Sequence, residues 1–143
     1  MRIYLSVPMI ANRSTPVANT IARAIRDSGH EVTSPWVLGP IEGQDRKVVD
    51  IFERDKRGAE DCDAIVADVS SPSIGVGMEL MAAHKAGKLV VVVAKEGSTV
   101  SRMLLHMPEK ESVEFKDEED LYSKLSKTLA GLKPKKSGAG SQK

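Results

Sequence analysis

The chain has 143 residues, of which 41% are hydrophobic and 29% charged, as is typical of one globular domain with a buried core. Twenty-one Lys and Arg side chains nearly balance twenty Asp and Glu, and this net charge of +1 argues against a general nucleic-acid-binding protein. The single cysteine, Cys62, cannot form a disulfide within the chain, and no apolar run is long enough to span a membrane. We therefore expect a cytoplasmic protein with neither a nucleic-acid nor a membrane partner, without a metal site and without a cofactor.

The first half of the chain alternates between strand-like and helix-like apolar spacing. The predicted elements are a strand over 3–7, a helix from 14 to 29, a strand over 31–34, a loop over 35–43 and a helix over 44–61. The first helix begins at Ser14-Thr15-Pro16, where a hydroxyl N-cap precedes a proline in the first turn, and Gly29 ends it.

The second half continues the same alternation. The predicted elements are a strand over 63–69, a turn-rich loop over 70–77, a helix over 78–86, a strand over 89–93, a short helix over 101–106, a strand over 113–115 and a helix over 117–132. Residues 89–93 are five consecutive branched apolar residues, which indicates a strand buried on both faces. Residues 133–143 consist mostly of Lys, Gly, Ser and Pro, so we predict one domain over 1–132 and a disordered tail after it.

Strands and helices in this order predict an α/β fold, a three-layer sandwich of the flavodoxin-like or Rossmann-like kind. Its five strands would form a parallel sheet with helices on both faces. In such folds ligands bind beyond the carboxyl ends of the strands, near the point where the strand order reverses. A site is therefore expected in the loops that follow Val7, Ser34, Val69 and Ala94.

The loop richest in candidate residues follows the strand over 63–69. Its small residues leave backbone amides open, and the N-terminus of a helix follows directly, so the segment is suited to an anion. Ser71 and Ser73 would add hydroxyl donors to the amides around Gly75 and Gly77. The alternative is that these glycines only form turns, because their spacing fits neither a dinucleotide fingerprint nor a Walker A loop.

Two carboxylates are expected to face the same crevice. Glu79 is predicted in the first turn of the helix over 78–86, where it either complements the helix dipole or serves as a nucleophile or base. Asp55 lies on the apolar stripe of the helix over 44–61, and the alternative is a boundary residue paired with Arg54 or Lys56, or one that faces water. Together, beside a phosphate-binding loop, these acids suggest cleavage of the glycosidic bond of a nucleotide.

Three further residues are weaker candidates. Tyr4 lies in the first strand and reaches either the crevice or the core. Trp36 either stacks on a base or covers the sheet edge, and Met9 either packs in the core or borders the pocket. Asp68 stands where a receiver domain carries its phospho-accepting aspartate, but the acids that such a domain needs after its first strand are absent.

Four segments together resemble one known family. They are Tyr4-Leu5-Ser6, Asp55, the stretch from Ser71 to Leu80 (SPSIGVGMEL) and Val100-Ser101-Arg102-Met103. In this order they are similar to the nucleoside 2-deoxyribosyltransferase superfamily, and within it to the 2'-deoxynucleoside 5'-phosphate N-hydrolase branch, from about residue 3 to 103. The resemblance implies a flavodoxin-like fold, a homodimer and a small-molecule nucleotide substrate.

The resemblance also implies a role for each matching residue. Glu79 matches a catalytic glutamate that attacks C1' and forms a glycosyl-enzyme. Asp55 matches an aspartate that assists proton transfer or positioning, and Tyr4 matches a tyrosine that contacts the catalytic carboxylate or the sugar. Ser73 matches a serine that binds the 5'-phosphate, and Ser101 matches a second phosphate-binding serine that the neighbouring subunit donates.

The chain also departs from the hydrolase pattern. Val7-Pro8-Met9-Ile10 replaces Gly-Ser followed by an arginine, so Arg13 would have to supply the missing charge, and Pro35-Trp36 replaces a polar stretch near the base pocket. Against the transferases, Ser71 stands where they tend to carry an acid before Pro72. The resemblance thus implies hydrolysis of 2'-deoxynucleoside 5'-monophosphates to free base and 2-deoxyribose 5-phosphate. Base exchange between deoxynucleosides and a nucleotide-binding module without catalysis are the alternatives.

Overall fold

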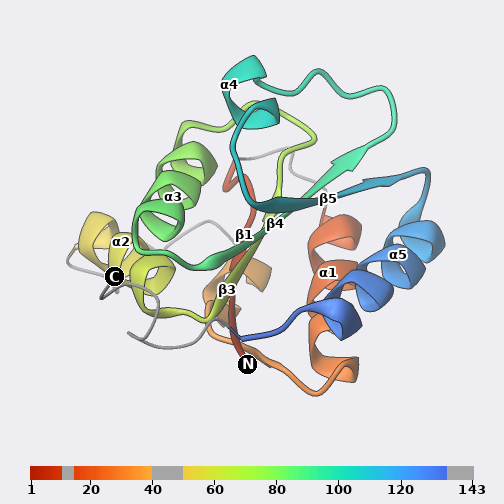
Figure 1. The fold of residues 1–143 in the computed structure, drawn as a ribbon, viewed down its shortest axis with the longest axis horizontal. Coiled ribbons are helices and arrows are strands. Elements are labelled where there is room, and N and C mark those ends of the chain that lie inside the picture. The colour runs from red at the N-terminus through yellow and green to blue at the C-terminus, as the bar shows by residue number, and fades with distance from the viewer. Residues whose placement is uncertain (11–14, 40–49, 135–143) are drawn as a thin grey trace.

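The computed structural model describes residues 1–10, 15–39 and 50–134, and they form a five-stranded sheet in the order β2-β1-β3-β4-β5 (Figure 1). All four strand pairs are parallel. The strands are β1 (Arg2–Ser6), β2 (Glu31–Val32), β3 (Ala64–Asp68), β4 (Leu89–Lys95) and β5 (Lys110–Phe115). The helices are α1 (Thr15–Asp27), the 3-10 helix η1 (Pro35–Leu38), α2 (Ile51–Asp61), α3 (Ile74–Lys85), α4 (Arg102–Leu105) and α5 (Glu118–Gly131). The predicted α/β fold with a parallel sheet is confirmed.

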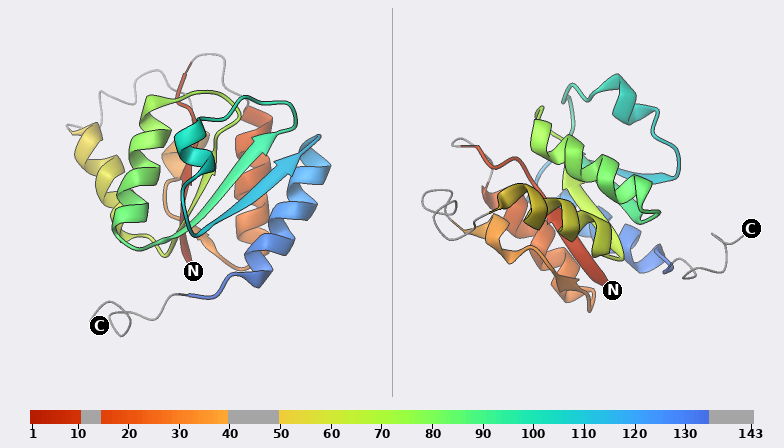
Figure 2. Two further views of the ribbon diagram at one scale, coloured as in Figure 1. Left: turned by 45° about the horizontal axis from the view of Figure 1, so that its top comes forward. Right: turned by 90° about the vertical axis from the view of Figure 1, so that its left-hand side faces the viewer.

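Helices cover both faces of the sheet (Figure 2). α1 and α5 pack on one face, and α2 and α3 pack on the other. Successive residues of a strand point to opposite faces. Ile3 and Leu5 of β1 therefore join the core beneath α1 and α5, whereas Tyr4 joins the core beneath α2 and α3. The strand order also reverses beside β1, so the carboxyl ends of β1 and β3 border the position where a ligand is expected.

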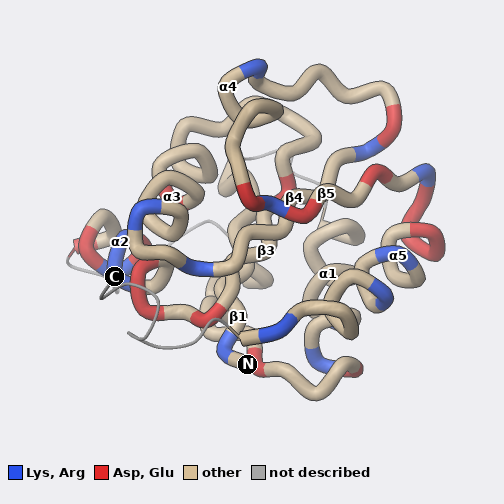
Figure 3. Tube along the Cα trace, viewed as in Figure 1, with Lys and Arg blue, Asp and Glu red and all other residues tan. Residues whose placement is uncertain are grey.

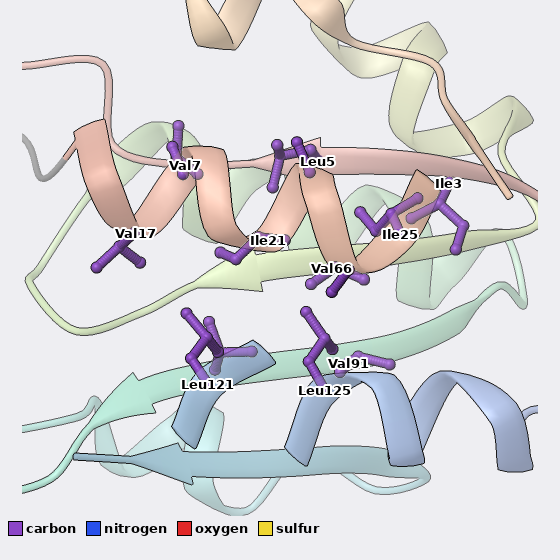
Figure 4. Packing of buried hydrophobic residues seen from close by; sticks show 14 of the residues in the cluster. Ile3, Leu5, Val7, Val17, Ile21, Ile25, Val66, Val91, Leu121 and Leu125 are labelled. Atoms are coloured by element: carbon purple, nitrogen blue, oxygen red, sulfur yellow. The ribbon is translucent and has the colours of Figure 1, made fainter. Parts of the chain in front are cut away.

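The core beneath α1 and α5 is built from large aliphatic side chains (Figure 4). Ile21 and Ile25 of α1 lie in one cluster with Leu5, and Leu121 and Leu125 of α5 complete the layer, all fully buried. Burying one such side chain contributes about 1.5–3 kcal/mol, so this side of the sheet supplies much of the stability.

The core beneath α2 and α3 contains more small side chains. Ala59, Ala67 and Ala83 are fully buried there. The largest side chain buried in this core is that of Tyr4. Small residues let α2 and α3 approach the sheet closely. This side also holds the buried polar groups described below.

Two helix starts differ from the prediction. α3 begins at Ile74 rather than Met78, because the Ser73 side chain caps it and accepts a hydrogen bond from the Val76 amide at 3.3 Å. α2 begins at Ile51, where Asp50 accepts from the amide of Glu53 at 2.9 Å, and the predicted residues 44–49 lie outside the described part of the chain.

Smaller differences concern the region after β1. β2 has two residues instead of the predicted four, and the start of the predicted loop is the 3-10 helix η1, which a proline begins. The predicted short helix over 101–106 is present as α4, and the last strand begins at Lys110, earlier than predicted. Residues 135–143 lie outside the described residues, so the disordered tail and the domain limit at 132 stay predictions.

Charges of both signs are interspersed along the described trace (Figure 3). Among the described residues, no helix has both the length and the apolar character needed to cross a membrane. The same residues contain no group of three or more His, Cys, Asp or Glu side chains placed to hold a metal ion.

Candidate active site

The carboxylate of Glu79 lies at the centre of a partly buried hydrogen-bonded cluster between α3 and β1. The Tyr4 hydroxyl donates to Oε2 of Glu79, and the Ser6 hydroxyl donates to Oε1 at 2.6 Å. Tyr4 and Ser6 are two residues apart on β1, so both point to the α2/α3 side, and both are fully buried. Each oxygen of the carboxylate therefore has its own hydroxyl donor.

The environment of Glu79 sets opposing influences on its protonation. Burial raises the pKa of Glu79 above its ordinary value, while the hydrogen bonds from Ser6 and Tyr4 lower it. The negative charge of Asp55 raises this pKa further, and the positive charge of Arg54 lowers it. Burial and the adjacent Glu79 raise the pKa of Tyr4, so its hydroxyl keeps the proton that it donates.

Asp55 is held at the rim of this cluster by the residue before it. The Nε of Arg54 donates to Oδ1 of Asp55 at 2.8 Å, and the two side chains are 22% and 28% exposed. The ion pair with Arg54 considered as an alternative for Asp55 is therefore present. Asp55 nevertheless acts on Glu79 and Tyr4 through its charge.

Trp36 is already engaged by neighbouring side chains. The guanidinium of Arg54 lies 4.4 Å from the centroid of the indole, and the Tyr4 ring meets the indole edge to face at 6.2 Å. One face of the indole is thus covered by Arg54, so a base that reached this region would meet a combined Trp36–Arg54 surface. The part played by Trp36 in a base pocket stays a prediction.

Gly58 explains how the Tyr4 ring reaches its position. A Cβ at this position of α2 would lie 2.5 Å from Cε1 and 2.8 Å from Cδ1 of Tyr4. The aromatic ring therefore lies directly against the backbone of the helix. Sequence alone assigns no role to Gly58, although a glycine inside a helix costs about 1 kcal/mol relative to alanine and so signals a special requirement.

The expected anion-binding segment is shorter than predicted and more helical. Ser73 is the N-cap of α3, so Gly75 and Gly77 lie within the first turn instead of in a loop, and Ser71 is exposed just before it. Glu79 is consequently in the second turn, and its placement in the first turn was wrong. Stabilisation by the helix dipole falls off beyond the first turn, so it does not account for this acid.

A second region, a cavity of about 1100 Å³, lies between α3 and the segment that leads to β5. Ser71, Ser73 and Ser101 line it together, which brings the three predicted phosphate-binding serines to one place. Arg102 also lines it, and sequence alone assigned no role to this cation although it lies in the motif around Ser101. The remaining lining is largely apolar.

The two regions lie on different faces of α3. Ile74, Gly77 and Met81 recur at helical spacing and line the cavity, whereas Glu79 projects toward β1. The N-terminal turn of α3 is what connects them, because Ser73 caps it and also lines the cavity.

The sequence also predicts Met9 and Arg13 at the site. Met9 is partly buried and packs against the core beneath α1 and α5, and its place at the border of a base pocket stays a prediction. Arg13 lies outside the described residues.

Comparison with known proteins finds clear relatives, although no protein-family model matches the chain. A protein of Methanococcoides burtonii is 38% identical over 109 residues, which cover 73% of this chain and 89% of that protein. A protein of Thermofilum pendens is 31% identical over 139 residues, which cover 92% of this chain and 96% of that protein. Both carry the curated name "Putative 2'-deoxynucleoside 5'-phosphate N-hydrolase 1".

Solved structures share the fold. A 2-deoxyribosyltransferase from Bacillus psychrosaccharolyticus superposes with a TM-score of 0.62 at 21% identity, covering 95% of this chain and all of that one (100%). The CMP N-glycosidase of Clostridium botulinum superposes with a TM-score of 0.60 at 19% identity, covering 87% of this chain and 98% of the other. At these identities the likeness establishes the fold alone.

Proposed function

The chain belongs to the 2'-deoxynucleoside 5'-phosphate N-hydrolase family, within the nucleoside 2-deoxyribosyltransferase superfamily, and we propose that it is an N-glycosidase of 2'-deoxynucleoside 5'-monophosphates. The products are the free base and 2-deoxyribose 5-phosphate. The observation that carries this proposal is Glu79, a half-buried carboxylate with a hydroxyl donor on each oxygen. Such a group is oriented, partly shielded from water and suited to attack on a sugar carbon.

The proposed reaction is a double displacement at C1'. An oxygen of Glu79 forms a bond to C1' while the C1'–N bond breaks, and the bonding electron pair leaves with the base, which gains a proton. Asp55 is the residue proposed to assist that proton transfer or to position the base, since it is partly exposed and close enough to influence Glu79. Water then attacks C1' as the bond from C1' to Glu79 breaks, which releases the carboxylate. The water gives up one proton, which balances the proton that the base gained.

The 5'-phosphate is proposed to bind at the N-terminus of α3. The hydroxyls of Ser71 and Ser73 and the amides at the very start of the helix, beside Gly75, are the proposed donors there. The amides of Val76 and Gly77 already donate to Ser73, so Gly77 is proposed to border the phosphate without donating to it. Ser73 and Glu79 are six residues apart, about 9 Å along a helix axis, and helical side chains tilt back toward the N-terminus. A sugar phosphate can span this separation, which supports a substrate whose phosphate and reacting carbon lie at opposite ends of the deoxyribose.

A homodimer is proposed to complete the phosphate site. Ile74 is 85% exposed and lines the cavity together with Met81 of α3 and Met103 of α4, which are exposed as well. Exposed apolar side chains gathered in this way are typical of a protein interface. We propose that Ser101, with Arg102 beside it, reaches the phosphate site of the neighbouring subunit in such a dimer. Within one chain Ser101 lines the same cavity as Ser71 and Ser73, so a role in its own subunit is the alternative.

The test is chromatography of purified protein incubated with each 2'-deoxynucleoside 5'-monophosphate and with the matching nucleoside. We expect free base from the monophosphates and little from the nucleosides. Base release that needs a second base as acceptor would replace hydrolysis with base exchange. Tight nucleotide binding without any base release would show a module without catalysis, and either result overturns the proposal.

A further inference from the structure

Ser6 occupies a position at which packing alone would favour an apolar residue. It ends β1, is fully buried, and points into the cluster beneath α2 and α3, where its register partner on β3 is Ala67. A buried hydroxyl is costly unless it is hydrogen-bonded. The bond that the Ser6 hydroxyl donates in this structure goes to Oε1 of Glu79, at 2.6 Å.

We propose that Ser6 is a positioning residue, whose hydroxyl holds one oxygen of Glu79 and keeps that carboxylate ionised and aimed at the sugar. This inference rests on the proposed function, because it assigns Glu79 the attack on C1'. A single donor from Tyr4 would leave the carboxylate free to turn about the bonded oxygen. Donors on both oxygens, two residues apart on a buried strand, fix the plane of the group.

The charged groups around Glu79 explain why the second donor is needed. From α2, Asp55 adds a negative charge that disfavours ionisation, and Arg54 adds a positive charge that favours it but is paired to Asp55. From β1, Tyr4 and Ser6 act only through their hydrogen bonds, and both oppose the effect of burial. Removal of the Ser6 hydroxyl takes away one of the two hydrogen bonds that lower the pKa of Glu79, so this carboxyl stays protonated to higher pH. A protonated carboxyl does not attack C1'.

The first experiment needs no substrate. The carboxyl carbon of Glu79 is titrated by NMR in carbon-13-labelled protein, and its signal is assigned by its loss in Glu79→Gln. In Ser6→Ala we expect the midpoint to rise by about one pH unit, since a hydrogen bond to a charged group contributes roughly that much. The midpoint in Ser6→Cys, which keeps a weak donor, should lie between those of Ser6→Ala and the unmodified protein.

The second measurement is the pH profile of kcat/KM for a 2'-deoxynucleoside 5'-monophosphate. Its acidic limb should move to higher pH by the same amount in Ser6→Ala. KM, measured at pH values well above that limb, should change little. An unchanged titration of Glu79 in a folded Ser6→Ala variant overturns the proposal. A shifted titration in a protein that releases no base supports the coupling of Ser6 to Glu79 and overturns the proposed function instead, so the two failures are distinguishable.

Ser34 provides a matched control. Like Ser6 it is a fully buried serine with a hydrogen-bonded hydroxyl. That hydroxyl bonds to the backbone of β1 and not to Glu79: it donates to the Leu5 carbonyl and accepts from the Leu5 amide, both at 2.8 Å. Ser34→Ala should lower the melting temperature and leave the Glu79 midpoint where it is in the unmodified protein. An equal shift in both variants would show a general loss of structure and would refute a specific role for Ser6.

Discussion

The two faces of α3 differ in almost every physical property. Toward β1, Glu79 accepts hydrogen bonds from two buried hydroxyls, and these contacts are made within one chain. Away from β1, the helix borders a wide cavity lined largely by apolar side chains, with Ile74 almost fully exposed. One face is suited to chemistry as it stands, and the other is suited to being covered.

This difference supports both proposals for one helix, a reaction on the face toward β1 and a subunit interface on the opposite face. The N-terminal turn belongs to both faces, because Ser73 caps the helix and lines the cavity. A substrate with its phosphate at that turn and its sugar beside Glu79 would extend from one region into the other. Changes on the first face should therefore affect the chemical step, and changes on the second should affect phosphate binding and assembly.

The largest effect is expected from Glu79→Gln. It keeps the size of the side chain and removes the nucleophile, so base release should fall by more than about a thousandfold. Because the amide also relieves a buried charge, the melting temperature should not decrease. Steady-state base release and thermal unfolding measure the two effects, and a variant that keeps most of its activity would remove Glu79 from the mechanism.

Ser101→Ala tests whether the second face acts across a dimer. Alone, it should lower kcat/KM for a monophosphate about 10- to 100-fold through loss of a phosphate contact. Mixed dimers of Ser101→Ala with Glu79→Gln should regain activity, because one of their two sites then combines an intact Glu79 with an intact Ser101 from the other subunit. If Ser101 served its own chain, that site would keep the defect, and no activity would return on mixing.

Some features of the fold and the site could be predicted from the sequence, and others could not. The parallel sheet could be predicted, because strand and helix periodicity are local signals. A specific local motif also singled out Glu79 and the serines as candidates, and their roles stay predictions. The start of α3 could not be predicted, since two glycines suggested a loop and the cap by Ser73 outweighs their low helix propensity.

Ser6 and Gly58 could not be predicted because their roles depend on contacts distant in sequence. Ser6 bonds Glu79 across 73 positions, and Gly58 is required only because the Tyr4 ring lies against it. Their partial signals were a serine in an apolar strand and a glycine inside a helix. Neither signal identifies the residue that is contacted, Glu79 for Ser6 and Tyr4 for Gly58, because only folding brings these residues together.

Gly58→Ala should produce an intermediate effect on the first face. An added methyl group usually stabilises a helix interior, but here it would displace the Tyr4 ring and loosen its hydrogen bond to Glu79. We expect kcat/KM to fall about 10-fold and the melting temperature to drop, as overpacking costs about 1–3 kcal/mol. Gly131→Ala is the control, because its Cβ would meet nothing within 4 Å. Similar behaviour of the two variants would contradict the contact with Tyr4.

The smallest effect is expected from Arg54→Lys at the rim. Lysine keeps the charge but loses the planar group that covers the Trp36 ring and the Nε that donates to Asp55. Both partners of this ion pair are partly exposed, so water and salt screen it and the loss of stability should be slight. Asp55 would nevertheless become less well oriented, and we expect kcat to fall about threefold while KM stays nearly constant. If KM rose instead, the Trp36–Arg54 surface would contact the base directly, and the rim would determine substrate choice as well as orientation.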